Sequence, residues 1–251
     1  MATLQWDHAV QFVNQPEAAI EIFAGQQLRA VAGGRHPGWG TRNALSYFGL
    51  TYIEFLAIAD PDELRAATDK FLLSRDAARL LPENEALFRV ALRSDDIDAT
   101  HDQLRRTGVT VSPIVDGQRN DPQGNIIPLA DLHHRWRHCR AGLSLCAAVG
   151  RRRRHPADAA ARPEAGRARI RWATLRLSRR CSRWSIRRRC AIAGRRCLAS
   201  ATGGAGTGRG RPAFIFREGA ANQLTELVFR VANPALKGQR FRVGNGVYRF
   251  T

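Results

Sequence analysis

Hydrophobic and polar positions alternate over residues 6–13 (WDHAVQFV), which predicts a β-strand with two unlike faces. One of these faces carries His8, Val10 and Phe12. After the strand, Pro16 stands where a helix can begin, and the apolar spacing behind it predicts a short amphipathic helix. The chain is therefore expected to open with a strand and a helix.

A glycine-rich stretch over residues 32–43 (AGGRHPGWGTRN) predicts a loop. Two strands are expected behind it, at residues 44–48 and 51–59, with Gly49 forming the turn between them. Apolar residues then recur at helical spacing over residues 62–81, which predicts one long helix.

The same order of elements then occurs a second time. A strand is predicted at residues 87–92 and a helix at residues 95–106, followed by further strands. A constant offset aligns the two copies and places Phe88 opposite His8. Two successive β-α-β-β units therefore fit the first half of the chain, which indicates an α+β fold.

The end of the chain alternates again. Residues 224–231 read as one strand, and Asn245-Gly246 between FRV and VYRF is typical of a two-residue hairpin turn. This β-rich ending needs partner strands, and they are expected upstream.

Between these two ordinary regions the composition changes. Residues 131–211 hold 22 Arg, three acidic residues, all five Cys, and no Lys, Phe or Tyr, a balance of 22 − 3 = +19. The rest of the chain carries 18 basic and 19 acidic residues, or −1, so the formal net charge of +18 belongs to this tract alone. Like charges at this density repel, and apolar periodicity is sparse, so the tract is predicted to be disordered or poorly packed.

Three interpretations of the Arg-rich tract compete. In the first, the tract binds nucleic acid, with Arg runs such as residues 151–154 neutralising phosphates non-specifically. In the second, it is a solvated linker. In the interpretation that we favour, it is the product of a shifted translation frame in GC-rich DNA, since such a shift produces Arg, Ala, Cys and Trp in excess. Permitted codons read one nucleotide later are compatible with a strand-like, aromatic continuation.

The segments WDHAV, AGGRHPGWGTRNALSYFG and TYIEFLAI resemble the glyoxalase-like branch of the vicinal oxygen chelate superfamily. The resemblance covers residues 4–127, with a family-like ending at residues 224–250. It implies tandem βαβββ modules whose sheets curl around a cavity. We expect three parts: residues 1–128 as the glyoxalase-like domain, residues 129–211 as the frameshifted tract, and residues 212–251 as a C-terminal β-rich remnant.

The same resemblance implies a metal site. His8 matches the ligand on the first strand of a module and Glu54 matches the ligand on its last strand, where a bound cation polarises a substrate oxygen and Glu54 takes part in catalysis. Imidazole and carboxylate suit Fe, Mn, Zn or Ni. The second module departs from the pattern, because Phe88 stands at its His position.

Three further residues lie in or beside the glycine-rich stretch and are expected to contact the substrate: His36, Trp39 and Asn43. In the alternative interpretation, the glycines shape a tight loop and His36 binds the backbone. Glu54 likewise has two interpretations. An inward carboxylate needs a ligand, a cation or a hydrogen-bond partner, whereas an outward one is solvated.

These observations predict a small-molecule-binding protein that acts as a metal-dependent lyase, isomerase or dioxygenase, impaired by the altered central tract. The alternatives are a nucleic-acid-binding protein that uses residues 131–211 and a non-catalytic protein that sequesters its ligand. A homodimer is compatible with this class. The first residues show no signal-peptide pattern and no apolar run is long enough to span a bilayer, so a cytoplasmic location without membrane contact is expected.

Overall fold

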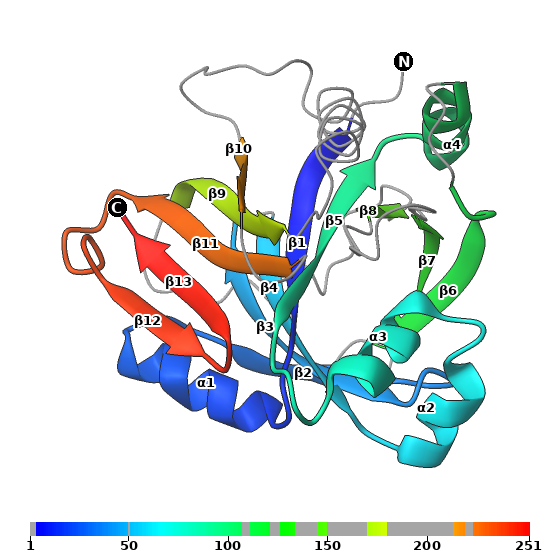
Figure 1. Cartoon of the computed structure of the whole chain (residues 1–251), viewed down its shortest axis with the longest axis horizontal. Coiled ribbons are helices and arrows are strands. Elements are labelled where there is room, and N and C mark those ends of the chain that lie inside the picture. Colours follow the sequence, from blue (N-terminus) through cyan, green and yellow to red (C-terminus); the bar gives the residue numbers. More distant parts are fainter. Residues whose placement is uncertain are drawn as a thin grey trace.

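The structure is a computed structural model (Figure 1). It describes residues 4–49, 51–106, 111–120, 126–133, 145–149, 170–179, 213–218 and 223–251. Most of the Arg-rich tract therefore lies outside the described residues.

The first module is a βαβββ unit. Its elements are β1 (Leu4–Phe12), α1 (Pro16–Gly25), β2 (Val31–His36), β3 (Thr41–Phe48) and β4 (Thr51–Ile58). The strand order is β2-β3-β4-β1, and the first strand runs parallel to the last. Alternation and the proline at the start of α1 therefore predicted β1 and α1 correctly.

The second module repeats this order. Its elements are β5 (Leu87–Ser94), α4 (Ile97–Arg106), β6 (Val115–Asn120), β7 (Ile126–His133) and β8 (Leu145–Val149), and β5 runs parallel to β8. Antiparallel pairing of β1 with β5 joins both modules into one eight-stranded sheet. The edge strands β2 and β6 approach each other, so the sheet curls round toward itself (Figure 1). The predicted α+β fold with tandem βαβββ modules is confirmed.

A second, five-stranded sheet ends the chain. It comprises β9 (Ile170–Arg179), β10 (Ala213–Glu218), β11 (Gln223–Val231), β12 (Arg240–Val243) and β13 (Gly246–Phe250), in the order β10-β9-β11-β13-β12. β9, the upstream partner of β11, lies in the Arg-rich tract, where the partner strands were expected. β8 also lies in that tract, and β7 crosses the expected boundary between residues 128 and 129. The tract was predicted to pack poorly, but the part of it that the structure describes forms β-strands.

The side chains on the two faces of β1 belong to two different hydrophobic clusters. Ala9 and Val13 belong to the larger cluster, which α1, β4 and β5 share with the C-terminal sheet. Val10 and Phe12 belong to the smaller cluster, which lies against α2 (Pro61–Ala67) and α3 (Leu72–Leu80). His8 follows Val10 and Phe12 by strand alternation, so it lies on the face that carries the smaller cluster.

The C-terminal sheet contributes large aromatic side chains to the larger cluster. Phe229, Tyr248 and Phe250 are fully buried there, and the Tyr248 ring contacts Phe23 of α1. The Tyr248 hydroxyl donates a hydrogen bond to the side-chain oxygen of Gln11 on β1, and burial raises the pKa of that hydroxyl well above its ordinary value. The last strands thus complete the core of the first module.

Three expectations about local structure were wrong. The glycine-rich stretch is not a loop, since β2 and β3 pair across a short turn at residues 37–40. The helix expected at residues 62–81 is two helices, because Phe71 turns away to stack on Trp39 at a centroid distance of 4.3 Å. The final hairpin pairs Val243 with Gly246, so its two turn residues are Gly244 and Asn245.

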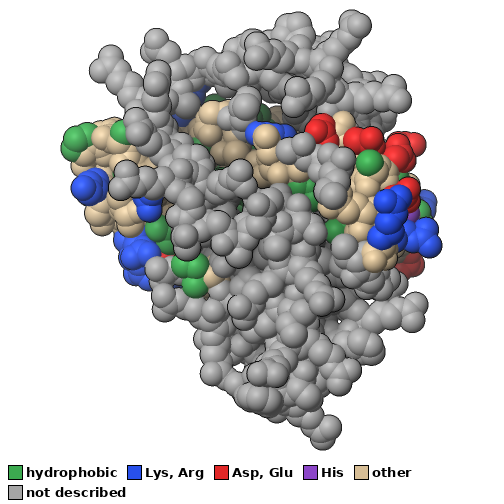
Figure 2. All heavy atoms as spheres, turned by 90° about the horizontal axis from the view of Figure 1, so that it is seen from above, with side chains coloured by type: hydrophobic (Ala, Val, Ile, Leu, Met, Phe, Trp, Pro, Cys, Tyr) green, Lys and Arg blue, Asp and Glu red, His purple; other side chains and the backbone are tan. Residues whose placement is uncertain are grey.

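Charged side chains of both signs lie on the side of the molecule where α4 is found (Figure 2). Figure 2 shows acidic side chains gathered on the side of the molecule where α4 lies. α4 has an acidic residue in its first turn, Asp98, and two basic residues in its last, Arg105 and Arg106, which complements the helix dipole. Within the described part of the chain, no helix is long and apolar enough to cross a membrane.

Candidate functional site

His8 and Glu54 lie side by side on the same face of the curled sheet. They come from the paired strands β1 and β4, in which His8 is opposite Tyr52 and Val10 is opposite Glu54. The distance from His8 Nε2 to Glu54 Oε2 is 3.5 Å, and their side chains are 8% and 9% exposed. Glu54 therefore faces inward, and the pairing of the two residues implied by the resemblance is present.

The His8 ring is held from two sides. Its Nδ1 lies 2.9 Å from Asp7 Oδ2, and its plane stacks on Tyr52 with a centroid distance of 4.4 Å and an angle of 15°. Burial acts to raise the pKa of Asp7, but its interactions with His8 and Arg93 outweigh that effect. The pKa of Asp7 is therefore lowered, so Asp7 is a carboxylate that accepts the Nδ1 proton of His8.

Glu54 is oriented by a chain of hydrogen bonds that begins at a backbone amide. The Gly34 N–H donates to Asn43 Oδ1 at 3.1 Å, so the NH₂ group of Asn43 must point the other way. That group donates to Glu54 Oε1 at 2.6 Å and lies 3.2 Å from His36 Nε2. His36 Nε2 therefore accepts, and its Nδ1 faces the Thr41 hydroxyl at 2.8 Å.

A glycine pair makes room for the Asn43 amide. In the pairing of β2 with β3, Ala32 is opposite Ala44 and Arg35 is opposite Arg42, so two glycines oppose Asn43 alone. This arrangement is a β-bulge, which re-aims side chains. A Cβ atom on Gly33 would lie 2.0 Å from Asn43 Oδ1. The glycine-rich motif therefore serves the placement of Asn43.

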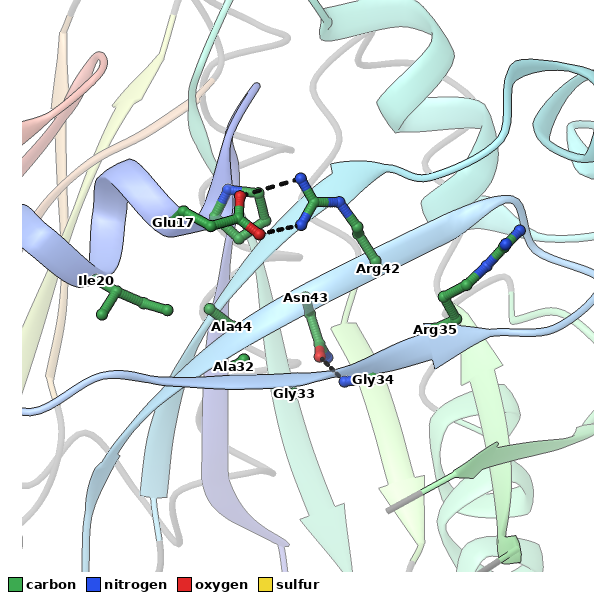
Figure 3. A pocket seen from close by; sticks show the side chains of 10 residues that line it. Glu17, Ile20, Ala32, Gly33, Gly34, Arg35, Arg42, Asn43 and Ala44 are labelled. Carbon is green, nitrogen blue, oxygen red and sulfur yellow. Dashed lines mark hydrogen bonds and ion pairs between the residues drawn. The ribbon is translucent and has the colours of Figure 1, made fainter. Parts of the chain in front are cut away.

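A hollow of about 230 Å³ lies next to this bulge, between the first turn of α1 and strands β2 and β3 (Figure 3). Its rim carries the ion pair between Arg42 and Glu17, and Asn43 with Gly34 forms part of its lining. His8 and Glu54 do not line this hollow. Asn43 is thus shared between the hollow and the buried polar cluster.

The structure brings together four of the five predicted site residues. His8, Glu54, Asn43 and His36 form one polar cluster, with His36 Nε2 4.0 Å from Glu54 Oε1. Trp39 stands apart from that cluster, because its ring stacks on Phe71 and lies 6.2 Å from the His36 ring. The His36 ring contacts the Thr41 and Asn43 side chains, and its contact with a substrate stays a prediction.

The second module lacks the corresponding pair. Phe88, at the His8 position, is buried in the smaller hydrophobic cluster. In the pairing of β5 with β8, Val90 is opposite Leu145, so Leu145 takes the register position that Glu54 has in β4. Among the residues that the structure describes, no group of three or more His, Cys, Asp or Glu side chains could hold a metal ion.

The distance between His8 and Glu54 suits two ligands of one metal ion. Two ligands held about 2.1 Å from a tetrahedral metal lie about 3.4 Å apart, close to the distance between these two side chains. That separation is 3.5 Å from His8 Nε2 to Glu54 Oε2. Within the described part of the chain no third side chain joins them as a ligand, so water or the substrate would fill the remaining positions there.

Sequence reasoning missed four participants. Asp7 binds His8 Nδ1 and is itself held by Arg93, Tyr52 stacks on the His8 ring, and the Thr41 hydroxyl lies against His36 Nδ1. Strand alternation assigns Asp7 to the face opposite His8, so no periodic signal could have paired them. Thr41 lies within the glycine-rich motif and could have been found once that motif was read as a hairpin.

Comparison with known proteins places the chain in a family. A family model described as "Glyoxalase-like domain" matches residues 6–180. No curated protein matches the chain. The structure is similar to that of a hypothetical protein from Staphylococcus aureus, with a TM-score of 0.78, 16% identity and 99% of each chain covered.

Smaller proteins match part of the structure. A methylmalonyl-CoA epimerase from Mycobacterium tuberculosis is 19% identical, with a TM-score of 0.42 over 62% of this chain and 91% of its own. A Streptomyces coelicolor methylmalonyl-CoA epimerase in complex with 2-nitronate-propionyl-CoA is 17% identical, with a TM-score of 0.43 over 60% of this chain and 99% of its own. The match over residues 6–180 shows that the chain belongs to the family of glyoxalase-like domain proteins.

Proposed function

We propose that the protein binds a small organic molecule through an oxygen atom at the His8–Glu54 pair, on the face of the sheet that carries Val10 and Phe12. The observation that carries this proposal is the buried contact between His8 Nε2 and Glu54 Oε2 at 3.5 Å. Because Asp7 takes the Nδ1 proton of His8, two lone pairs face each other across that gap unless a cation is shared between them. A proton or a divalent metal ion would satisfy both groups.

We further propose His8 and Glu54 as the two protein ligands of a divalent metal, with Fe, Mn, Zn or Ni as candidates. Such a metal, when bound, polarises a substrate oxygen. The chain's own residues then have separate roles. His8 supplies a neutral nitrogen, Glu54 supplies a carboxylate that can also accept a proton from the substrate, and Asn43 fixes the direction of that carboxylate. His36 and Trp39 are proposed substrate contacts beside this centre.

The proposed reaction class is that of a metal-dependent lyase, isomerase or dioxygenase. One observation favours a second candidate, a protein that sequesters its ligand without chemistry. The second module carries Phe88 and Leu145 at the two ligand positions, so at most half of a paired site is present in the described residues. The nucleic-acid interpretation rests on the Arg-rich tract, which lies largely outside the described residues, and it stays a prediction together with the shifted reading frame, the homodimer and the cytoplasmic location.

Titration of the metal-free protein with Zn²⁺ in a calorimeter tests the proposal. Wild-type protein should bind one ion, and both His8→Ala and Glu54→Gln should abolish that binding, because each removes one of only two protein ligands. His101→Ala is the matched control, since His101 lies on α4 and is 18% exposed there, and it should bind Zn²⁺ as wild type does. Equal Zn²⁺ binding by wild type and His8→Ala would remove His8 as a ligand and overturn the proposal.

A further inference from the structure

The strand that carries His8 is interrupted at the residue just before it. In the pairing of β1 with β5, Trp6 is opposite Leu92 and His8 is opposite Ala91. Asp7 is therefore an extra residue in β1, which makes a β-bulge. Bulges bend a strand and turn a side chain out of the normal alternation. This bulge explains how the carboxylate of Asp7 reaches the ring of its own neighbour instead of pointing to the opposite face.

The bulged carboxylate is held at both of its oxygens. Asp7 Oδ2 lies 2.9 Å from His8 Nδ1, and Asp7 Oδ1 lies 3.3 Å from Arg93 Nη1. Arg93 comes from β5 in the second module and also donates to the side-chain oxygen of Gln5, at 2.8 and 3.2 Å. Because a guanidinium carries only donors, the oxygen that faces Arg93 must be an acceptor.

We propose that Asp7 is a positioning residue of the His8–Glu54 centre: it holds His8 in the Nδ1–H tautomer, with Nε2 turned toward Glu54, and Arg93 of the second module fixes the carboxylate that does so. Carboxylates in this position set the tautomer and the basicity of a ligating or proton-transferring histidine. This inference rests on the proposed function for its biological meaning, but the tautomer of His8 can be measured whether or not a metal binds.

Asp7→Asn tests this proposal directly, because the donors of Arg93 determine the orientation of the new amide. The amide oxygen has to face the Arg93 donors, so the NH₂ group faces His8 Nδ1. Nδ1 must then accept, and the ring proton moves to Nε2, where it points at Glu54. We expect Asp7→Asn to invert the His8 tautomer and to weaken Zn²⁺ binding by about 10- to 100-fold.

The double variant Asp7→Asn, Arg93→Met provides a rescue. Without the guanidinium the amide is free to turn its oxygen toward His8 Nδ1, so the Nδ1–H tautomer should return. A purely structural role for Asp7 predicts no such recovery, because the double variant removes more contacts than the single one. Asp98→Asn on α4 makes the same change from carboxylate to amide at an exposed position, so it is the matched control and should leave the tautomer unchanged.

The measurement is a correlation of the imidazole ¹⁵N and ¹H signals in mildly alkaline buffer, with the His8 signals assigned from their loss in His8→Gln. The expected wild-type result is a proton on Nδ1. A wild-type Nε2–H tautomer, an unchanged tautomer in Asp7→Asn, or an inverted tautomer with unchanged Zn²⁺ affinity would each overturn the proposal. If wild type binds no Zn²⁺, the metal part of the proposed function fails, and the tautomers alone decide the role of Asp7.

Discussion

Replacement of Gly33 by alanine should disturb the site through one identifiable clash. The new Cβ atom would lie 2.0 Å from Asn43 Oδ1, whereas contacts below 3.0 Å are essentially never seen for real Cβ atoms. The Asn43 amide must therefore move by at least about 1 Å (3.0 − 2.0). A movement of that size breaks the bond from Gly34 N–H and the bond to Glu54, which are now 3.1 and 2.6 Å long.

The expected loss follows from the two bonds. The neutral bond from Gly34 contributes about 0.5–1.5 kcal/mol and the bond to the Glu54 carboxylate about 1.5–3 kcal/mol. Loss of chain entropy in the unfolded state offsets about 0.4–1 kcal/mol of this for a Gly→Ala change. We therefore expect Gly33→Ala to lower the free energy of unfolding by about 1–4 kcal/mol and to weaken Zn²⁺ binding, because Glu54 loses its orientation.

Urea denaturation of a double-mutant cycle measures this effect. In an Asn43→Ala background the clashing oxygen is gone, so Gly33→Ala should cost less than about 1 kcal/mol there. Gly25→Ala is the control, because a Cβ at Gly25 meets nothing within 4 Å and its φ is not positive. If Gly33→Ala costs as much with Asn43→Ala as without it, the clash with the Asn43 amide is not the cause and the reasoning is refuted.

Three further predictions concern buried polar groups. Asp76→Ala should cost about 3–5 kcal/mol in urea denaturation, because Arg89 (5% exposed) loses its partner in a buried ion pair; a cost below about 1 kcal/mol would contradict that pairing. Tyr248→Phe should cost about 1–3 kcal/mol, since it leaves the fully buried oxygen of Gln11 without its donor, and a neutral result would contradict the bond. The pKa of Asp7 is lowered from 3.8 in the folded protein, so its stabilising contribution is present above pH 3.8 and is lost as the pH falls through the folded pKa. The difference in unfolding free energy between wild type and Asp7→Ala should therefore shrink in acid. A difference that does not change with pH would argue against the lowered pKa.

Residue periodicity anticipated the architecture because each module repeats a strong local signal. Alternation placed His8 on the face of Val10 and Phe12, and the structure agrees. Internal comparison of the two modules also identified Phe88 as the residue opposite His8. Its side chain has no donor atom for a metal and packs in the smaller hydrophobic cluster instead.

Tertiary contacts decided the features that the sequence did not reveal. The glycine-rich stretch forms strands because β2 pairs with β3, and the Asn43 side chain supplies a hydrogen bond where the bulge interrupts that pairing. The long helix divides because Phe71 gains a stacking partner in Trp39, which lies far away in the sequence. Asp7 belongs to the candidate site because of a bulge, and a bulge reverses the very alternation from which strand faces are predicted.

The C-terminal sheet packs against residues from the start of the chain, and this has a consequence for synthesis of the protein. Trp6, Val13 and Phe23 are made early, yet they share their core with Phe229 and Tyr248, which are made last. During translation the nascent amino-terminal half therefore exposes hydrophobic surface until the final strands leave the ribosome. We expect that interval to be the period in which a chaperone is needed and in which truncated products aggregate.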